Sequence, residues 1–362
     1  MNKLVIAQID TVAGDIKNNS QKIIDCIIKA KKEKSDLIIF PEYVLTGYPF
    51  GDILSRNNFI AQMQQTELEN IVNKSTDITV VLSYANIEGD ITKSCTVIIQ
   101  NGKIMQNNQI FCINNEKYGI ISTNADKLEF SEKPDTVINI DCSPSRTAKE
   151  YLKDYRFSSF AKDNDVNYIY VNKAGYADNY SFDGTSRIYD KTGKVILRAK
   201  TFEEDFVVTE DYAGKINELP IGMGKKVNTD NFEMDYTSDL ARTYKSIVFS
   251  IKQYFCKNGF TKAVLGLSGG LDSSVSAVLL ADALGSENIW GISMPSKITT
   301  NESKSDAQSL AKNLDINFTS ALKLYEENQK LIEEKTIGNI FDWFAIGSVI
   351  MGIIGFCVIT VP

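Results

Sequence analysis

The chain has 362 residues, which is enough for two domains of ordinary size. Hydrophobic residues make up 43% and charged residues 23%, which excludes disorder by composition, and a net charge of −7 without a basic cluster argues against a nucleic-acid partner. The sequence contains no histidine, which excludes Ser-His-Asp and Cys-His catalysis and histidine-ligated zinc or haem. Acid–base chemistry must therefore come from Asp, Glu, Lys, Tyr or Cys.

Strand and helix patterns alternate over residues 1–210. An apolar run at 4–9 predicts a strand, isoleucines on one face predict a helix at 18–34, and 36–41 predicts a second strand ended by proline. Further strands are predicted at 79–84, 96–99, 119–122, 136–140 and 167–172, a helix at 145–162 and a hairpin at 188–198. This alternation favours an α/β domain with a large mixed sheet.

A second domain is predicted after a linker. Residues 211–239 are polar and rich in glycine and proline, as linkers are. In 240–338 a helix (240–258) precedes strands at 263–267 and 289–294, which alternate with helices at 275–284 and 303–314, so a parallel sheet is expected.

The tail, 339–362, has an unusual composition. Residues 343–361 are nineteen uncharged residues, long enough to span a bilayer. A buried helix or strand pair is one interpretation, but the flanking residues offer no ordinary end to a domain. The segment is therefore interpreted either as membrane-like or as a collapsed or unnatural terminus. The six cysteines stand singly without CxxC spacing and the amino terminus has no apolar signal segment, so we expect reduced thiols and a cytoplasmic protein.

The most specific pattern is GLSGGLDSS at 266–274, between a predicted strand and a predicted helix. Its glycines let the backbone approach a phosphate, successive N–H groups form an anion nest, and the helix N-terminus adds positive charge. A glycine turn with a serine cap would not need Asp272, whose carboxylate is suited to Mg²⁺. The sequence therefore predicts a site for ATP phosphates at Gly266, Leu267, Ser268, Gly269, Gly270, Leu271, Asp272 and Ser273, with Asp272 as the metal ligand.

This loop resembles the SGGxDS signature of the N-type ATP pyrophosphatases, which cleave ATP between the α and β phosphates and adenylate an oxygen for attack by an amine. The stretches ALGSENIWGISMPS (283–296) and TTNESKSDA (299–307) are similar to the NAD synthetases among them. The resemblance implies that Met294 and Ser296 lie near the nucleotide. For Ser303 and Asp306 the alternative to a role at the nucleotide is structural, with Ser303 as a helix N-cap and Asp306 as a first-turn charge.

The segment LIIFPEYVLTGYP at 37–49 resembles the first catalytic element of the nitrilase superfamily, whose αββα sandwich carries a Glu-Lys-Cys triad. Further stretches match that superfamily at 141–145, 168–172, 181–186 and 190–205. The resemblance implies that Glu42 is the proton acceptor of an amidase, with a cysteine as nucleophile and a lysine for the oxyanion.

Two departures concern the rest of that triad. No lysine stands where the family has one after residues 102–104, and Lys117 falls closer to the next strand. Thr123 occupies the position of the nucleophile, and its hydroxyl is far less acidic than a thiol, which ionises near a pH of about 8.5. Cys142 is the alternative nucleophile, but its spacing to 168–172 fits a different element. We therefore expect glutamine hydrolysis to be lost.

Together, the resemblances imply a nitrilase-like αββα sandwich followed by an incomplete, Rossmann-like ATP pyrophosphatase domain. The family is that of glutamine-dependent NAD synthetases, degenerate in the first domain and cut short in the second. The implied activity is a ligase that uses ATP and Mg²⁺ to amidate deamido-NAD with ammonia or glutamine, releasing AMP and pyrophosphate, in a homo-oligomer. The alternative is a catalytically inactive remnant that retains at most ATP binding, and Thr123 argues against a third hypothesis, a stand-alone amidase.

Overall fold

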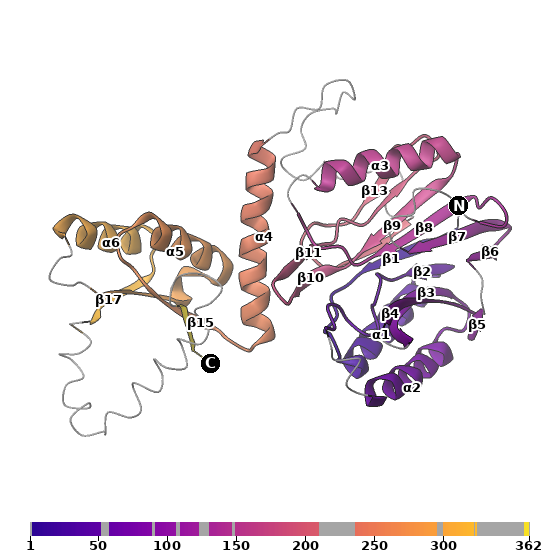
Figure 1. Ribbon diagram of the computed structural model, residues 1–362, viewed down its shortest axis with the longest axis horizontal. Helices are drawn as coiled ribbons and strands as arrows, with labels where there is room; N and C mark the ends of the chain where they lie inside the picture. The colour runs from indigo at the N-terminus through magenta and orange to yellow at the C-terminus, as the bar shows by residue number, and fades with distance from the viewer. Residues whose placement is uncertain are drawn as a thin grey trace. The chain divides into compact units, whose positions relative to one another are not determined.

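The computed structural model describes residues 2–51, 58–88, 91–105, 109–122, 130–146, 149–209, 236–294, 300–321, 323 and 358–361. The chain divides into two compact units, Met1–Ser246 and Ile247–Pro362 (Figure 1). Most of the predicted linker 211–239, and the apolar tail up to residue 357, lie outside the described residues. The two units are taken in turn.

The first unit contains two six-stranded sheets. One has the order β14-β1-β2-β3-β4-β5, formed by β14 (Asp205–Val208), β1 (Leu4–Gln8), β2 (Leu37–Ile39), β3 (Thr79–Glu88), β4 (Ile91–Gln100) and β5 (Lys103–Met105). The other has the order β13-β12-β9-β8-β7-β6, formed by β13 (Val195–Arg198), β12 (Arg187–Tyr189), β9 (Asn167–Asn172), β8 (Thr136–Asp141), β7 (Glu116–Ser122) and β6 (Ile110–Ile113). The central strands of each sheet run parallel and the outer ones antiparallel, and a separate hairpin joins β10 (Ala174–Ala177) to β11 (Tyr180–Asp183).

Helices cover the outer faces of the two sheets. Side chains of α1 (Ile16–Lys32) and α2 (Asn58–Lys74) pack on the first sheet, and Phe157 and Ala161 of α3 (Lys149–Asn164) pack on the second. A third apolar cluster fills the space between the sheets. The unit therefore has four layers, which confirms the expected αββα sandwich (Figure 1).

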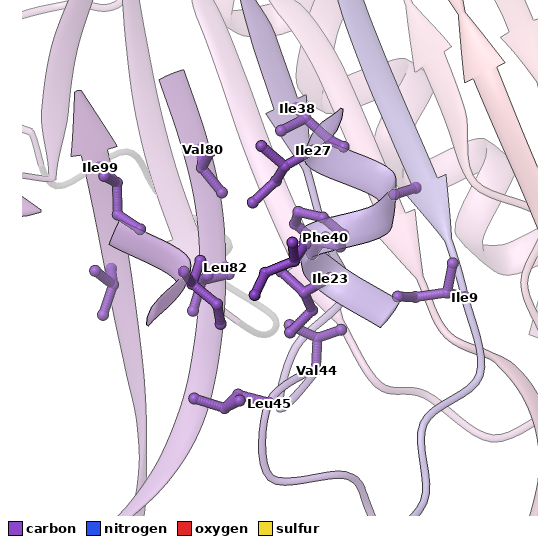
Figure 2. Close-up of a cluster of buried hydrophobic side chains, with 14 of the residues drawn as sticks. Ile9, Ile23, Ile27, Ile38, Phe40, Val44, Leu45, Val80, Leu82 and Ile99 are labelled. Carbon is purple, nitrogen blue, oxygen red and sulfur yellow. The ribbon is translucent and has the colours of Figure 1, made fainter. Parts of the chain in front are cut away.

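Strand β1 shows how the sequence specifies these layers. Val5 and Ala7 point into the core under α1 and α2, whereas Leu4 and Ile6 point into the core between the sheets. A strand covered on both faces is expected to be a continuous apolar run, as this one is. In α1, Ile23 and Ile27 lie one turn apart and face Ile38 and Phe40 at the end of β2, as Figure 2 shows.

The second unit is built on a parallel sheet, as predicted. Its order is β17-β16-β15-β18, with β15 (Lys262–Gly266), β16 (Ile289–Ser293) and β17 (Asn317–Ser320) parallel. The helices are α5 (Leu271–Leu284), α6 (Asn301–Asn313) and α4 (Tyr236–Lys257), which contains the boundary between the units and contributes Phe255 to this core; the short 3-10 helix η2 (Ser286–Asn288) precedes β16.

The end of the apolar tail forms a strand. Residues of β18 (Val358–Val361) pair antiparallel with β15, from Leu265↔Val358 to Lys262↔Val361. This pairing covers the edge of β15. Among the residues that the structure describes, no helix is long and apolar enough to cross a membrane.

Candidate functional site

The predicted phosphate loop connects the end of β15 to the start of α5. Gly269 has φ +81°, and a Cβ there would lie 2.2 Å from the carbonyl oxygen of Ser303 in the first turn of α6. Only glycine adopts this conformation without strain and fits so close to another backbone. The loop is therefore held against the N-terminus of α6 by a contact that excludes any side chain.

Serine hydroxyls hold the loop closed on itself. Ser273 is 1% exposed, and its Oγ lies 3.1 Å from Ser268 Oγ and donates to the Gly270 carbonyl at 3.0 Å. The Gly270 N–H donates to Ser268 Oγ at 3.2 Å, and Ser274 Oγ donates to the Gly270 carbonyl at 2.8 Å. Ser273 thus shapes the loop from inside, and Leu267 is a core residue, 1% exposed.

The outer side of the loop is open. Ser268, Gly270, Leu271 and Asp272 are exposed, and Gly266 and Gly269 are half-buried. Gly270 is the N-cap of α5 and makes no side-chain cap bond, so the first-turn amides of the helix are left for another acceptor. An exposed loop that leads into a helix N-terminus fits a phosphate chain.

Asp272 lies in the first turn of α5, beside these amides. No group of three metal-ligating side chains occurs among the described residues. This donor set fits Mg²⁺, which is commonly held by one or two carboxylates and completes its shell with phosphate oxygens and water. It does not fit a closed site made by the protein alone.

The neighbouring strand end and helix contribute two further observations. Met294 is 61% exposed just beyond β16, and its Cε lies 2.9 Å from where a Cβ of Gly266 would be. Ser296 lies outside the described residues. The N-cap of α6 is Thr300, whose Oγ1 accepts the Ser303 N–H at 3.2 Å. The alternative interpretation of Ser303 as the N-cap and of Asp306 as a first-turn charge is therefore wrong, since Glu302 is the acidic residue of the first turn.

Glu42 follows β2 and is 5% exposed. Its N–H donates to the carbonyl of Asp141 at 3.2 Å, which joins the end of the first sheet to the end of the second. Burial raises the pKa of this carboxyl to about 7; the charge of Asp141 adds to the rise and the Ser94 hydroxyl partly offsets it. A carboxyl group with a pKa near neutrality is suited to move protons.

The structure does not bring a lysine from the expected segment to Glu42. Lys117 lies in the first half of β7, exposed and paired with Glu132 at 2.5 Å. Glu42 lies beside Asp141, at the opposite, carboxyl end of the parallel strands β7 and β8. Thr123, the predicted occupant of the nucleophile position, lies outside the described residues.

A buried lysine that the sequence analysis missed follows β9, where its charge acts on the Cys142 thiol. Lys173 is 2% exposed, and its Nζ donates to the carbonyls of Thr11 at 2.7 Å and Tyr48 at 3.1 Å and pairs with Asp10 at 3.1 Å. Two of the three N–H donors of this ammonium group are thus used on carbonyl oxygens, and its charge is paired with that of Asp10. The sequence does show a lysine directly after the apolar strand β9. Its burial could not be predicted, because its partners lie up to 162 positions away in the sequence.

Cys142 follows β8 and is 8% exposed. Burial raises the pKa of its thiol, and the charge of Lys173 only partly offsets this. Nearby donors are occupied, because the N–H of Cys142 bonds to Asp141 Oδ1 at 2.8 Å and that of Ser143 to Asn172 Oδ1 at 2.8 Å. A protonated thiol without free donors for an oxyanion is a poor replacement nucleophile.

Comparisons with known proteins agree with both halves of this description. Residues 3–141 match the carbon-nitrogen hydrolase family and residues 243–336 match the NAD synthase family. Glutamine-dependent NAD(+) synthetases from Aquifex aeolicus and Synechocystis are 31% and 30% identical to the chain, each over 88% of its length.

A solved structure shares the fold. The glutamine-dependent NAD+ synthetase from Acinetobacter baumannii, in complex with ADP, superposes with a TM-score of 0.74 at 24% identity, over 97% of this chain and 72% of that one. The chain spans 65% and 64% of the lengths of the Aquifex and Synechocystis relatives. The chain therefore combines a carbon–nitrogen hydrolase region with an NAD synthase region, and the proteins it resembles over most of its length are glutamine-dependent NAD(+) synthetases.

Proposed function

We propose that the chain is a ligase of the NAD(+) synthetase type, which amidates deamido-NAD at the expense of ATP and releases AMP and pyrophosphate. The observation that carries this proposal is the loop at 268–272, which is exposed at Ser268, Gly270, Leu271 and Asp272 and leads into α5 in the region that matches the NAD synthase family. A homo-oligomer and a cytoplasmic location remain predictions.

The roles of the loop residues follow from their positions. The backbone N–H groups ahead of α5 would hold the phosphates, and Gly269 allows the backbone to approach them closely. Asp272 would hold Mg²⁺, whose charge offsets that of the leaving pyrophosphate. The deamido-NAD carboxylate would attack the α-phosphorus, and ammonia would then displace AMP from the acyl adenylate.

We infer that the nitrogen enters as ammonia and that the glutaminase reaction is lost. The support lies in the partners of the two lysines: Lys117 pairs with Glu132, and Lys173 donates to the carbonyls of Thr11 and Tyr48 and pairs with Asp10. Thr123 stands where the family has its cysteine. Glu42 has a pKa suited to proton transfer, and among the described residues neither Lys117 nor Lys173 pairs with it.

The test is NAD formation by the purified chain with ATP, Mg²⁺ and deamido-NAD, supplied with either ammonia or glutamine. NAD from ammonia alone is the expected result, and NAD from glutamine would overturn the inference about the amidase. No NAD from either source would favour the inactive remnant. Substitution Asp272→Ala should abolish the ammonia-dependent signal, whereas Asp25→Ala, at an exposed position on α1, should leave it unchanged.

A further inference from the structure

A surface cavity lies in the first unit where α1 and α2 end side by side (Figure 1). Its volume is about 500 Å³, a size that is common for small-molecule sites. The lining comes from the carboxyl-terminal parts of the two helices and from the segment just after α2; it consists of Ile28, Lys31, Lys32, Asn73, Lys74 and Thr76. None of these residues belongs to the phosphate loop or to the groups around Glu42.

Every polar side chain in the cavity can donate a hydrogen bond. Three are lysine ammonium groups, and the other two are the Asn73 amide and the Thr76 hydroxyl. Lys31 Nζ donates to Thr76 Oγ1 at 3.1 Å, which leaves the hydroxyl proton of Thr76 available to donate. No carboxylate lines the cavity, and within the part of the chain that the structure describes none pairs with Lys31, Lys32 or Lys74. In a chain of net charge −7, this cavity is a local concentration of positive charge.

A structural alternative is that the lysines only serve the carboxyl ends of the two helices, where cations are favourable. Other groups already satisfy carbonyls at these ends. In α1, the N–H groups of residues 33–35 donate to the carbonyls of residues 29–31. In α2, the N–H and the Oγ of Ser75 donate to two carbonyls near the end of the helix. Capping therefore does not require Lys32 and Lys74.

The helix ends also leave most of the positive charge unbalanced. Each end carries a partial negative charge of about one half, so the two ends together offset about one of the three lysine charges. Ammonium groups that share a cavity also repel one another, and an anion between them would turn this repulsion into attraction. A ligand that matches the cavity therefore carries two or more negative charges.

Size and one apolar side chain narrow the class of ligand further. A halide or a single inorganic phosphate would fill only a small part of the cavity. Ile28 is 41% exposed and offers an apolar contact for a carbon skeleton. Lysine is a common ligand of phosphate groups, on which it acts as a point charge. A phosphorylated organic molecule combines these properties.

We propose that this cavity is a binding site for a phosphorylated metabolite with two or more negative charges, of the kind of a sugar bisphosphate. Its phosphate groups would contact Lys32 and Lys74, and its carbon skeleton would lie against Ile28. The site lies in the carbon–nitrogen hydrolase region and is separate from the proposed ATP site in the second unit. The proposal therefore stands whether or not the chain forms NAD.

Calorimetric titration of the full chain with fructose 1,6-bisphosphate tests the proposal, at constant ionic strength because salt screens exposed charges. A saturable binding heat is expected. The double variant Lys32→Met with Lys74→Met should bind on the order of tenfold more weakly, because exposed ion pairs each contribute modestly. The double variant Lys17→Met with Lys162→Met changes the net charge equally at exposed positions outside the cavity, and it should bind like the wild type.

Three results would overturn the proposal. The first is the absence of a saturable heat with the wild type. The second is binding that is lost in Gly269→Ala but kept in the double variant at Lys32 and Lys74, which would place the bisphosphate at the phosphate loop. The third is an equal affinity for citrate, which would show that the cavity responds to charge and not to phosphate. Lys32 and Lys74 are exposed, so an unchanged melting temperature should confirm that their double variant is folded.

Discussion

At the residue scale, the groups predicted from local sequence are those that follow a strand directly. Glu42 after β2 and the loop after β15 could be predicted because a strand end, a proline or glycine and a carboxylate stand together in a few positions. Lys173 could not, because its contacts depend on partners in other elements. Arg198 of β13 is a second case, because it meets Asp154 of α3 across 44 positions of sequence, and no periodicity encodes such a pair.

The raised pKa of Glu42 predicts a pH effect on stability. Its pKa is about 7 in the folded protein, against 4.5 for an ordinary glutamate, so the folded state binds more protons between these values. Stability from this group is therefore present below about pH 4.5 and is lost as the pH rises to about 7. Relative to Glu42→Gln, the wild type should lose about 1–3 kcal/mol of unfolding free energy between pH 5 and pH 8. Urea unfolding of both proteins at both pH values measures this difference. The same change in unfolding free energy for the wild type and Glu42→Gln would contradict the prediction.

At the element scale, long and evenly apolar elements were predicted best. The helix α1 and the central strands were expected close to their observed positions, because several side chains repeat the same periodicity. Short strands were not predicted, because four residues at a sheet edge or in a hairpin are too few to show a hydrophobic periodicity; these are β6, β10, β11 and β14. Strand β18 was missed because a uniformly apolar run does not distinguish a strand from a membrane segment.

Two glycines provide a matched pair for testing the phosphate loop. Gly269 and Gly259 both have positive φ, +81° and +71°, but a Cβ at Gly269 would meet the Ser303 carbonyl, whereas nothing lies within 4 Å at Gly259. Gly259→Ala should cost about 1–2 kcal/mol from the left-handed conformation alone. Gly269→Ala should cost more and should also abolish ATP binding, as measured by calorimetry. Equal effects of the two substitutions would show that the loop is not tightly held.

The first half of α4 is tied to the β10–β11 hairpin by charge. Arg242 bonds to Asp183 at 2.5 Å, and the Asp183 side chain is 1% exposed, while Ser246 and Ser181 lie 2.6 Å apart. Arg242→Met should destabilise the first unit by about 3–5 kcal/mol, because it leaves a buried carboxylate without its cation. The double variant Arg242→Met with Asp183→Asn should regain part of the lost free energy of unfolding, as measured by denaturant unfolding. No recovery would mean that packing of the arginine stem dominates.

At the scale of the whole molecule, the order of the two regions was predictable, and the four-layer sandwich followed from the nitrilase-like segments. What could not be predicted is how the tail completes the second sheet, since Lys262 and Val361 pair across nearly a hundred positions. Such long-range strand pairing depends on the unpaired backbone groups along the edge of β15, and the composition of the tail does not reveal them.

Deleting residues 358–362 should therefore affect one unit only. Loss of β18 exposes the edge of β15, which lowers the stability of the second unit and favours aggregation. Thermal unfolding should show an earlier transition for that unit and an unchanged one for the first. A single unchanged transition would show that β18 contributes nothing to the sheet.

The burial of β1 on both faces has a consequence for how its register is encoded. In a strand with one wet face, a shift by one residue is penalised because polar and apolar side chains exchange places. Here that penalty is small for Leu4–Ala7, since both faces of these residues are buried in apolar clusters. The alignment is instead marked at the end of the strand, where buried Gln8 donates to the carbonyls of Lys200 and Glu203 and accepts from Ser186. A shift by one residue would break these bonds, and Gln8→Leu would remove the polar group that aligns the strand.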